Sequence, residues 1–258
     1  MWEYAINLNS DNSESAKYIF NNLKDCSKEF NGVVTTYESE GNITILVGCE
    51  DFEKIHLQFV INELLTEVIS VFFKEKFLNK YLSLPIKNEV NLAALKKALV
   101  SFDKETDVHI IKKYLKLDEN IFLESFFDFK LRTLRNKWLE LVNLANENSS
   151  YLACNETFVE LLKFLVDNLE ISYELINVLI KKDEIKICDG KFEKIAIFNT
   201  SCSGDDALFI TNIISLCPKS IIVYCDSNID NSSLSLMCQI FDNRIKILPY
   251  ELCISKNS

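Results

Sequence analysis

Glycine and proline are scarce in this chain, with five glycines and three prolines among 258 residues. Loops that hold phosphate groups need clustered glycines, because their backbone approaches the ligand closely. The sequence contains no Gly-x-Gly-x-x-Gly or Walker-type loop, and no Gly-x-Ser-x-Gly turn of the kind that carries a nucleophilic serine. These absences exclude the glycine-dependent nucleotide-binding loops and that type of hydrolase.

Histidine and closely spaced cysteines are also lacking. The two histidines, His56 and His109, have no cysteine or aspartate at a spacing that suits a metal ion, and we interpret both as structural residues. Nine cysteines are present, an odd number, and none form a Cys-x-x-Cys pair. Because cysteine is commonly a small buried hydrophobe, we expect reduced core thiols in a cytoplasmic protein, with no cofactor.

No uncharged apolar run reaches the roughly 18 residues that a membrane-spanning helix needs. The best candidate, residues 59–73, contains Glu63 and Glu67. At the N-terminus no basic region precedes an apolar stretch, so we expect neither a signal peptide nor a transmembrane segment. Apolar residues make up 48% and charged residues 26% of the chain, which is typical of a globular protein.

The chain has fewer basic residues than acidic ones, 28 against 38. The net charge is -10 at pH 7, and residues 1–85 hold 7 lysines against 13 acidic residues. Non-specific nucleic-acid binding depends on the neutralisation of phosphates by lysine and arginine. The acidic N-terminal third therefore disfavours that function, and we expect an unknown protein partner or self-association instead.

Hydrophobic periodicity divides the chain into three expected regions. An N-terminal α/β unit occupies 1–85, a helical region occupies 86–170, and a C-terminal α/β unit occupies 171–258. The first pattern predicts a β-α-β-β-α order, with elements at residues 3–8, 13–30, 32–38, 43–48 and 51–82. The second predicts helices at residues 91–102, 106–117, 119–146 and 155–167.

The C-terminal region alternates strands and helices. Asp189-Gly190 is a strong hairpin signal, and predicts that a strand at 184–188 pairs with a return strand at 192–198. Beyond it we expect a helix, a strand, a helix and a strand at residues 204–216, 220–225, 232–241 and 244–248. This order predicts a small parallel-type sheet with flanking helices, so the expected fold class is mixed α/β (α+β).

Arginine has only three copies, and two of them, Arg132 and Arg135, lie three residues apart in an expected helix. Residues three apart share a helix face, and a guanidinium group can hold an anion through two parallel hydrogen bonds. Together with Lys130 they form a candidate anion site. The alternative is that they pair with carboxylates of the same fold, such as Asp128, Asp167 or the later Asp205 and Asp206.

Three acidic residues are candidates for metal binding or general base chemistry. Asp205 and Asp206 open an expected helix, where carboxylates also stabilise free backbone N–H groups. Asp226 follows an apolar strand, and ligands gather beyond the carboxyl ends of strands in open α/β sheets. Helix capping and ordinary turn formation are the competing interpretations, and the sequence leaves both open.

Two stretches carry a family resemblance, which covers roughly residues 115–250. Residues 126–132, with 158–167 after them, resemble the middle of the YtxC-like sporulation proteins of spore-forming bacteria. Residues 204–208, continuing to 217–223, resemble the C-terminal block of that family. There an acidic pair opens a helix that leads into a proline and an apolar strand.

The resemblance implies a role in sporulation, but it brings no reaction, cofactor or catalytic residue. The family pattern reads Phe-Arg-Leu-Lys-x-Tyr, whereas here Lys130 and Arg132 exchange the basic types and Leu134 replaces the tyrosine. We therefore expect a non-catalytic, sporulation-associated accessory or interaction protein. The alternative is a metal-dependent phosphate- or nucleotide-binding enzyme that uses the basic helix 130–137 and the acids near 205–206 and 226.

Overall fold

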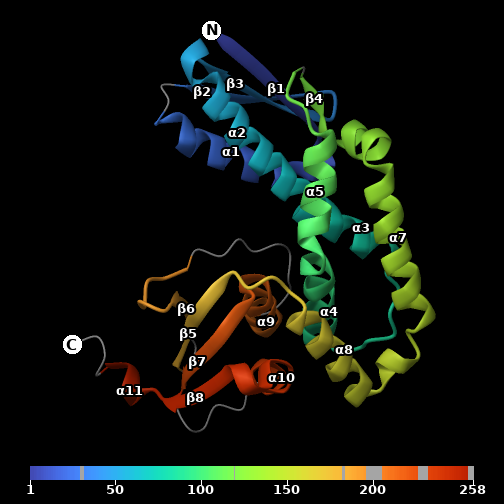
Figure 1. Ribbon diagram of the computed structural model, residues 1–258, viewed down its shortest axis with the longest axis vertical. Coiled ribbons are helices and arrows are strands. Elements are labelled where there is room, and N and C mark those ends of the chain that lie inside the picture. The colour runs from blue at the N-terminus through green and yellow to red at the C-terminus, as the bar shows by residue number, and fades with distance from the viewer. Residues whose placement is uncertain (30–31, 119, 182–183, 196–204, 226–231, 255–258) are drawn as a thin grey trace. The chain divides into compact units, whose positions relative to one another are not determined.

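The computed structural model describes residues 1–29, 32–118, 120–181, 184–195, 205–225 and 232–254 (Figure 1). The chain forms two compact units. Unit 1 contains Met1–Tyr81 and Asp103–Asn143, and unit 2 contains Leu82–Phe102 and Leu144–Ser258. Each unit combines a four-stranded sheet with helices, so the expected mixed α/β fold class is confirmed.

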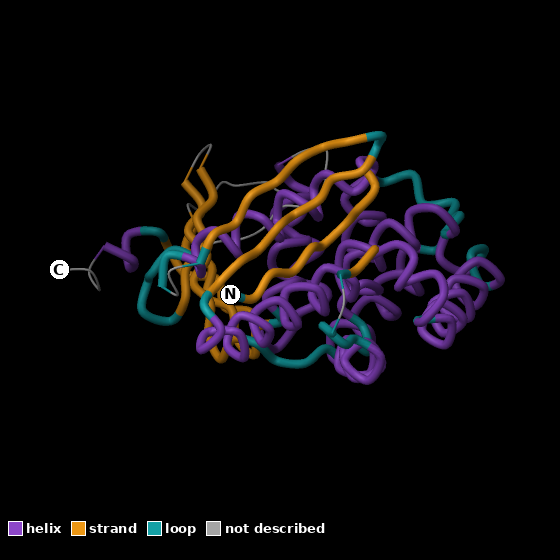
Figure 2. The backbone as a smooth tube through the Cα atoms, turned by 90° about the horizontal axis from the view of Figure 1, so that it is seen from above, coloured by secondary structure: helices purple, strands orange, loops and turns teal. Residues whose placement is uncertain are grey.

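The sheet of unit 1 has the strand order β2-β3-β1-β4 (Figure 2). Its strands are β1 (Trp2–Asn9), β2 (Val33–Ser39), β3 (Asn42–Cys49) and β4 (Ile121–Phe122). β3 pairs antiparallel with both β1 and β2. The two neighbouring strands expected at 32–38 and 43–48 are confirmed as a hairpin, and Glu40 and Gly41 in its turn have φ angles of 49° and 79°, as a tight hairpin turn requires.

Helices α1 (Ser13–Ser27) and α2 (Lys54–Glu67) pack beside this sheet and against each other. Ile6, Ile19 and Ile45 are completely buried between the layers. Alternation along the strands and the 3.6-residue period of α1 bring these apolar side chains to one interface. The core of unit 1 therefore lies between the sheet and its helices.

The expected long helix at 51–82 is confirmed, but it is not uniform. It begins with the 3-10 turn η2 (Asp51–Glu53) and α2. A π-helical segment, η3 (Val68–Phe73), then leads into α3 (Lys74–Tyr81). π-Helical turns are rare and are often found at functional sites.

The second segment of unit 1 corrects one expectation. It holds α5 (Lys104–Tyr114), β4, the short α6 (Leu123–Ser125), the π-helical η4 (Phe126–Lys130) and α7 (Arg132–Glu147), which continues into unit 2. The expected continuous helix over 119–146 is therefore wrong in its first part.

Pairing with β1 explains why the chain is extended at β4. Ile121 and Phe122 lie in parallel register with Ile6 and Asn7. The Asn7 side chain donates a hydrogen bond to the Ile121 carbonyl at 3.2 Å. This strand addition satisfies polar groups along the edge of the sheet, which local helical periodicity cannot reveal.

The sheet of unit 2 has the order β6-β5-β7-β8. Its strands are β5 (Tyr173–Lys181), β6 (Glu184–Asp189), β7 (Pro218–Cys225) and β8 (Ile245–Pro249). β5, β7 and β8 are mutually parallel, and β6 pairs antiparallel with β5. The expected parallel-type sheet is confirmed, and the buried run at the end of β7 is typical of such sheets.

The hairpin expected at Asp189-Gly190 is present only in part. The main partner of β6 is β5, and a single antiparallel bridge joins Cys188 to Lys194 beyond the turn. The Asp189 side chain accepts hydrogen bonds from the backbone of Lys191 and Glu193, both at 2.9 Å. Residues 196–198 of the expected return strand lie outside the described residues.

Four longer helices pack within unit 2. They are α4 (Glu89–Ser101), α8 (Asn155–Asp167), α9 (Asp205–Leu216) and α10 (Ser232–Phe241). α4 contacts α9 and α8, and α10 contacts the same two helices. The short α11 (Glu251–Ile254) follows β8. Helices of the expected region 86–170 thus belong to both units, because each packs on a sheet or helix that is distant in sequence.

Candidate functional site

The basic residues lie around the start of α7, in unit 1. Lys130 and Arg132 are exposed. Arg135 lies 3.2 Å from the Asp128 carboxylate and donates to the Asp128 carbonyl at 3.1 Å. Its guanidinium group also lies over the Phe127 ring, 5.7 Å from the ring centre. Asp128, one of the internal counter-ions considered from the sequence, therefore holds Arg135.

Arg132 differs from Arg135 in its surroundings. It forms no ion pair with any residue that the structure describes. An anion site at Lys130, Arg132 and Arg135 stays a prediction, and the exposed Arg132 is its most available guanidinium group.

The acidic candidates lie in unit 2 or outside the described residues. Asp205 and Asp206 open α9, as expected. The Asp206 backbone carbonyl accepts a hydrogen bond from the Ser233 hydroxyl at 2.9 Å, which joins α9 to α10. Asp226 lies outside the described part of the chain. Within that part, no three histidine, cysteine or acidic side chains are grouped as metal ligands.

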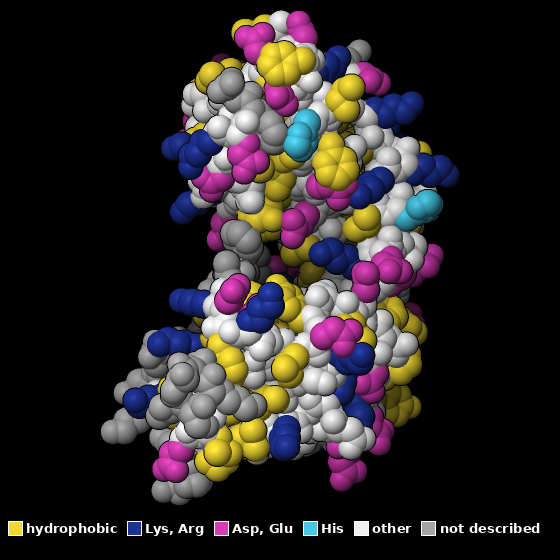
Figure 3. All heavy atoms as spheres, turned by 60° about the vertical axis from the view of Figure 1, so that its left-hand side comes forward, with side chains coloured by type: hydrophobic (Ala, Val, Ile, Leu, Met, Phe, Trp, Pro, Cys, Tyr) yellow, Lys and Arg dark blue, Asp and Glu magenta, His cyan; other side chains and the backbone are white. Residues whose placement is uncertain are grey.

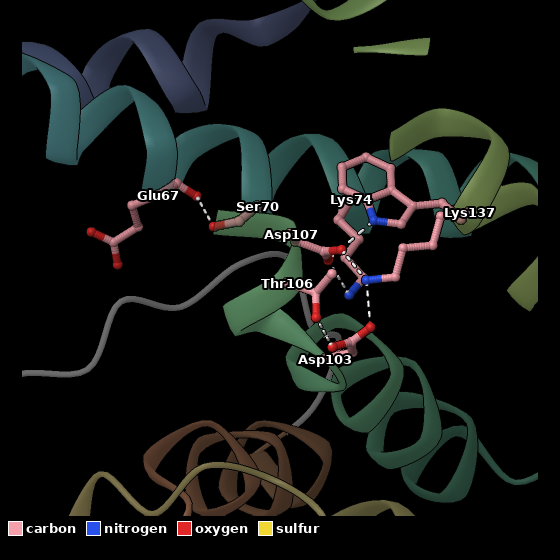
Figure 4. Close-up of polar contacts among 8 residues, drawn as sticks. Glu67, Ser70, Lys74, Asp103, Thr106, Asp107 and Lys137 are labelled. Atoms are coloured by element: carbon pink, nitrogen blue, oxygen red, sulfur yellow. Dashed lines mark hydrogen bonds and ion pairs between the residues drawn. The ribbon is translucent and has the colours of Figure 1, made fainter. Parts of the chain in front are cut away.

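Unit 1 contains a buried charge cluster that the sequence analysis missed. It consists of Lys74, Asp103, Asp107, Lys137 and Trp138 (Figure 4). The Lys74 ammonium lies 2.7 Å from one Asp107 oxygen, and the Trp138 indole N–H donates to the same oxygen at 3.1 Å. Lys137 contacts the other oxygen at 2.7 Å and also pairs with Asp103. One carboxylate thus receives three donors from α3 and α7.

Burial gives this cluster its electrostatic character. The side chains of Lys74 and Asp107 are 1% and 0% exposed. Desolvation lowers the pKa of Lys74, although Asp107 opposes the shift. Burial also acts against the charge on Lys137, but hydrogen bonds to Asp103 and Asp107 outweigh it and raise the Lys137 pKa.

Asp103 lies at the edge of the cluster. Burial alone would raise its pKa, but hydrogen bonds from Lys137 and Thr106 prevail and lower it. One sequence signal could have indicated the cluster: Asp103 and Asp107 precede the buried Ile111 at spacings of four, so α5 places acids in line with a core residue.

Access decides what the cluster can do. A buried amine with a lowered pKa can act as a nucleophile or base when a substrate reaches it. Here the Lys74 side chain is buried, and its amine lies 5.9 Å from the centre of the Trp138 ring, which packs with Phe77 and Phe127 at 5.5 to 5.7 Å. We therefore assign the cluster a structural role, in which it fastens α3, α5 and α7 together.

A surface groove in unit 1, the α2 groove, has a volume of about 420 Å³. Its lining residues are Ile55, Gln58, Phe59, Asn62, Glu63, Lys112, Leu117 and Asp118. The Gln58 side chain donates to the Leu117 carbonyl at 3.3 Å, and Glu63 pairs with Lys112. The first five residues come from α2, while the others come from α5 and the segment after it.

Large apolar side chains are exposed along α2 and the turn before it. Phe52, Ile55 and Phe59 are 78%, 80% and 63% exposed, and their spacing places them on one side of the helix. Figure 3 shows hydrophobic side chains standing at the surface among acidic ones on this unit. A contiguous exposed apolar patch commonly marks an interaction site.

Comparison with protein families matches residues 75–246, more than half of the chain, to the YtxC-like family. The chain belongs to the YtxC-like family. No curated protein and no solved structure matches it. In this YtxC-like protein the matched segment contains Asp103, Asp107 and Lys137, whereas the α2 wall of the groove precedes it.

One long helical segment of this YtxC-like protein, Asp51–Tyr81, is long and apolar enough to cross a membrane by length and composition. Core helices of soluble proteins meet the same criteria. In the structure this segment carries the buried Lys74, which is paired with Asp107 of α5. The expected absence of a transmembrane segment stays a prediction.

Proposed function

We propose that this YtxC-like protein is a cytoplasmic, sporulation-associated accessory protein that binds another protein through the α2 groove. Family membership supports the link to sporulation. The observation that carries the binding role is the line of Phe52, Ile55 and Phe59, exposed beside a groove. Burying such side chains removes apolar surface from water, which is the main driving force of protein association.

The structure of unit 1 also favours binding over catalysis. The amine of Lys74, whose pKa is lowered by burial, is inaccessible because its side chain is only 1% exposed. The groove is lined by an apolar stripe, two amides and a salt bridge between Glu63 and Lys112. Such a mixture of an apolar centre and a polar edge is typical of a protein-binding surface.

The test compares Phe59→Asp with Phe129→Asp in a spore-forming host whose own copy of the gene has been replaced. The two phenylalanines are similarly exposed, 63% and 66%, and both lie in unit 1. We expect Phe59→Asp to reduce the number of heat-resistant spores at least about tenfold, as for loss of an interface anchor. Phe129→Asp should leave the spore count unchanged, with equal protein levels on immunoblots. Normal sporulation of the Phe59→Asp strain would contradict the proposal.

A further inference from the structure

We infer that the α2 groove binds a positively charged amphipathic helix of a partner protein, an inference that rests on the proposed function. The shape and the charge of the groove both favour this occupant. Both arguments use residues of unit 1 alone.

Shape favours a helix. One wall of the groove is α2 itself, with lining residues at 55, 58, 59, 62 and 63, which recur every three to four residues. A second helix laid along this wall can place its own apolar side chains between these ridges. Partner helices of this kind present apolar anchors at positions i, i+3 or i+4, and i+7.

The ends and floor of the groove limit how such a helix can lie. The Glu63–Lys112 pair joins α2 to α5 at the last lining residue of α2. The hydrogen bond from Gln58 to the Leu117 carbonyl ties the two walls together below the surface. Ile55 and Phe59 are left as the apolar anchors that a partner can cover.

Charge favours a basic partner. Two carboxylates line the groove, and Lys112 neutralises one of them, Glu63. The other, Asp118, is exposed and forms no ion pair with any described residue. A lysine or arginine of the partner can pair with Asp118 and lie against the face of Phe59, where a cation is attracted to the ring.

Charges beside the groove are of both signs, so Asp118, unpaired among the described residues, is the residue that selects a basic partner. Glu50 and Glu53 lie just before α2, and Lys54 and Lys116 offset them. A second copy of this chain related by a twofold axis would bring two Asp118 carboxylates into one interface. Anionic lipid surfaces attract basic rather than acidic segments.

The experiment measures binding of two synthetic peptides to the full-length protein by fluorescence anisotropy. Both have about 18 residues, or five helical turns, with leucines on one face. One carries lysines on the other face, and its matched partner carries glutamates. We expect the lysine peptide to bind at least about tenfold more tightly than the glutamate peptide, a difference of about 1.4 kcal/mol.

Two variants with the same charge change locate the binding site. Phe59→Asp should weaken binding of the lysine peptide at least about tenfold, because an apolar anchor is lost. Phe129→Asp adds the same negative charge at a similarly exposed phenylalanine, and should leave the affinity unchanged. Asp118→Asn should weaken binding by a smaller factor and reduce its dependence on salt, because one ion pair is removed.

Three results would overturn the inference. The first is equal binding of the two peptides or no binding of either, and the second is undiminished binding to Phe59→Asp. The third is a different occupant. Dimers in sedimentation that Phe59→Asp dissociates would indicate a second copy, and binding to phosphatidylglycerol vesicles that the same variant abolishes would indicate a membrane. The proposed function is judged separately by spore counts, so failure of one test leaves the other intact.

Discussion

Lys74 and Asp107 show how a charged pair is retained in the core of unit 1. Removing two charges from water is costly, and their attraction compensates only when further hydrogen bonds satisfy both groups. Asp107 meets this condition, since it accepts from Lys74, Lys137 and the Trp138 indole. Because Asp107 is the shared acceptor of three donors, of which Lys74 is one, the two residues are not equivalent.

This asymmetry gives a prediction about stability. Asp107→Leu should lower the free energy of unfolding by about 3–5 kcal/mol, because a buried ammonium group loses its counter-ion. Lys74→Met should cost less, since Lys137 and Trp138 still contact Asp107. Adding Lys74→Met to Asp107→Leu should recover part of the loss. The measurement is urea unfolding followed by tryptophan fluorescence, because both tryptophans, Trp2 and Trp138, lie in unit 1. Purely additive effects of the two substitutions would argue against the pairing.

Asp103 gives a prediction about pH. Its pKa is lowered in the folded protein, so the unfolded chain takes up a proton first as the pH falls. The stabilisation from the Asp103 carboxylate is therefore complete above its ordinary pKa of 3.8 and is lost as the pH falls through the folded value. Asn is a suitable replacement because Asp103 has a φ of 55°, which Asn tolerates.

The wild type should therefore be more stable than Asp103→Asn at neutral pH, and the difference should shrink below about pH 4. Urea unfolding at a series of pH values measures it. A difference that stays constant down to pH 3 would show that the Asp103 charge does not stabilise the fold.

At the scale of elements, the π-helical segments explain how long helices keep one face buried. From Leu57 to Phe77 the residues at every fourth position are all buried: Leu57, Ile61, Leu65, Ile69, Phe73 and Phe77. In a regular α-helix of 3.6 residues per turn, such a series rotates steadily around the axis. The wider turn of η3 counters this rotation and brings Phe73 and Lys74 into the core.

The second π-helical segment, η4, is held to α7 by Arg135. We expect Arg135→Gln to lower the free energy of unfolding by about 0.5–1 kcal/mol, through loss of the Asp128 contacts and the Phe127 ring contact. Arg132→Gln is the matched control in the same helix and should change it by less than about 0.5 kcal/mol. Tryptophan fluorescence in urea again provides the measurement, and equal effects of the two substitutions would contradict the assignment.

Most elements could be predicted from the sequence because their signals are local. α10 spans Ser232–Phe241, the range expected from the sequence. β4 could not be predicted, because Ile121 and Phe122 are extended only through their pairing with β1. The buried charge cluster could not be predicted for the same reason. Its members come from three helices, and no local pattern distinguishes Lys74 from a solvated lysine. Of the three residues of the predicted anion site, Arg135 is paired with an internal carboxylate, that of Asp128.

At the scale of the whole molecule, the basic and acidic candidate residues belong to different units. Lys130, Arg132 and Arg135 lie in unit 1, while Asp205 and Asp206 lie in unit 2. The alternative function, a metal-dependent phosphate- or nucleotide-binding enzyme, requires them to act on one ligand. A ligand that binds only the folded state raises the melting temperature.

If the protein is an accessory protein without a nucleotide site, as proposed, its melting temperature should not increase when Mg²⁺ and ATP are added together, as measured by differential scanning calorimetry. Arg132→Gln serves as the control for any shift that does occur, because Arg132 is the exposed guanidinium group of the basic helix. A rise of several degrees that Arg132→Gln abolishes would favour the enzyme and count against the accessory role.

The packing of α4 on α9 has a consequence for the chain while it is being made on the ribosome. Ala94, Leu95, Ala98 and Leu99 of α4 are buried in the finished protein, partly against a helix that begins only at Asp205. At ordinary rates of translation, α9 emerges roughly 5 to 20 s after α4. During that interval a nascent chain carries an apolar helix without its final partner, and transiently exposed apolar surface of this kind is prone to aggregation.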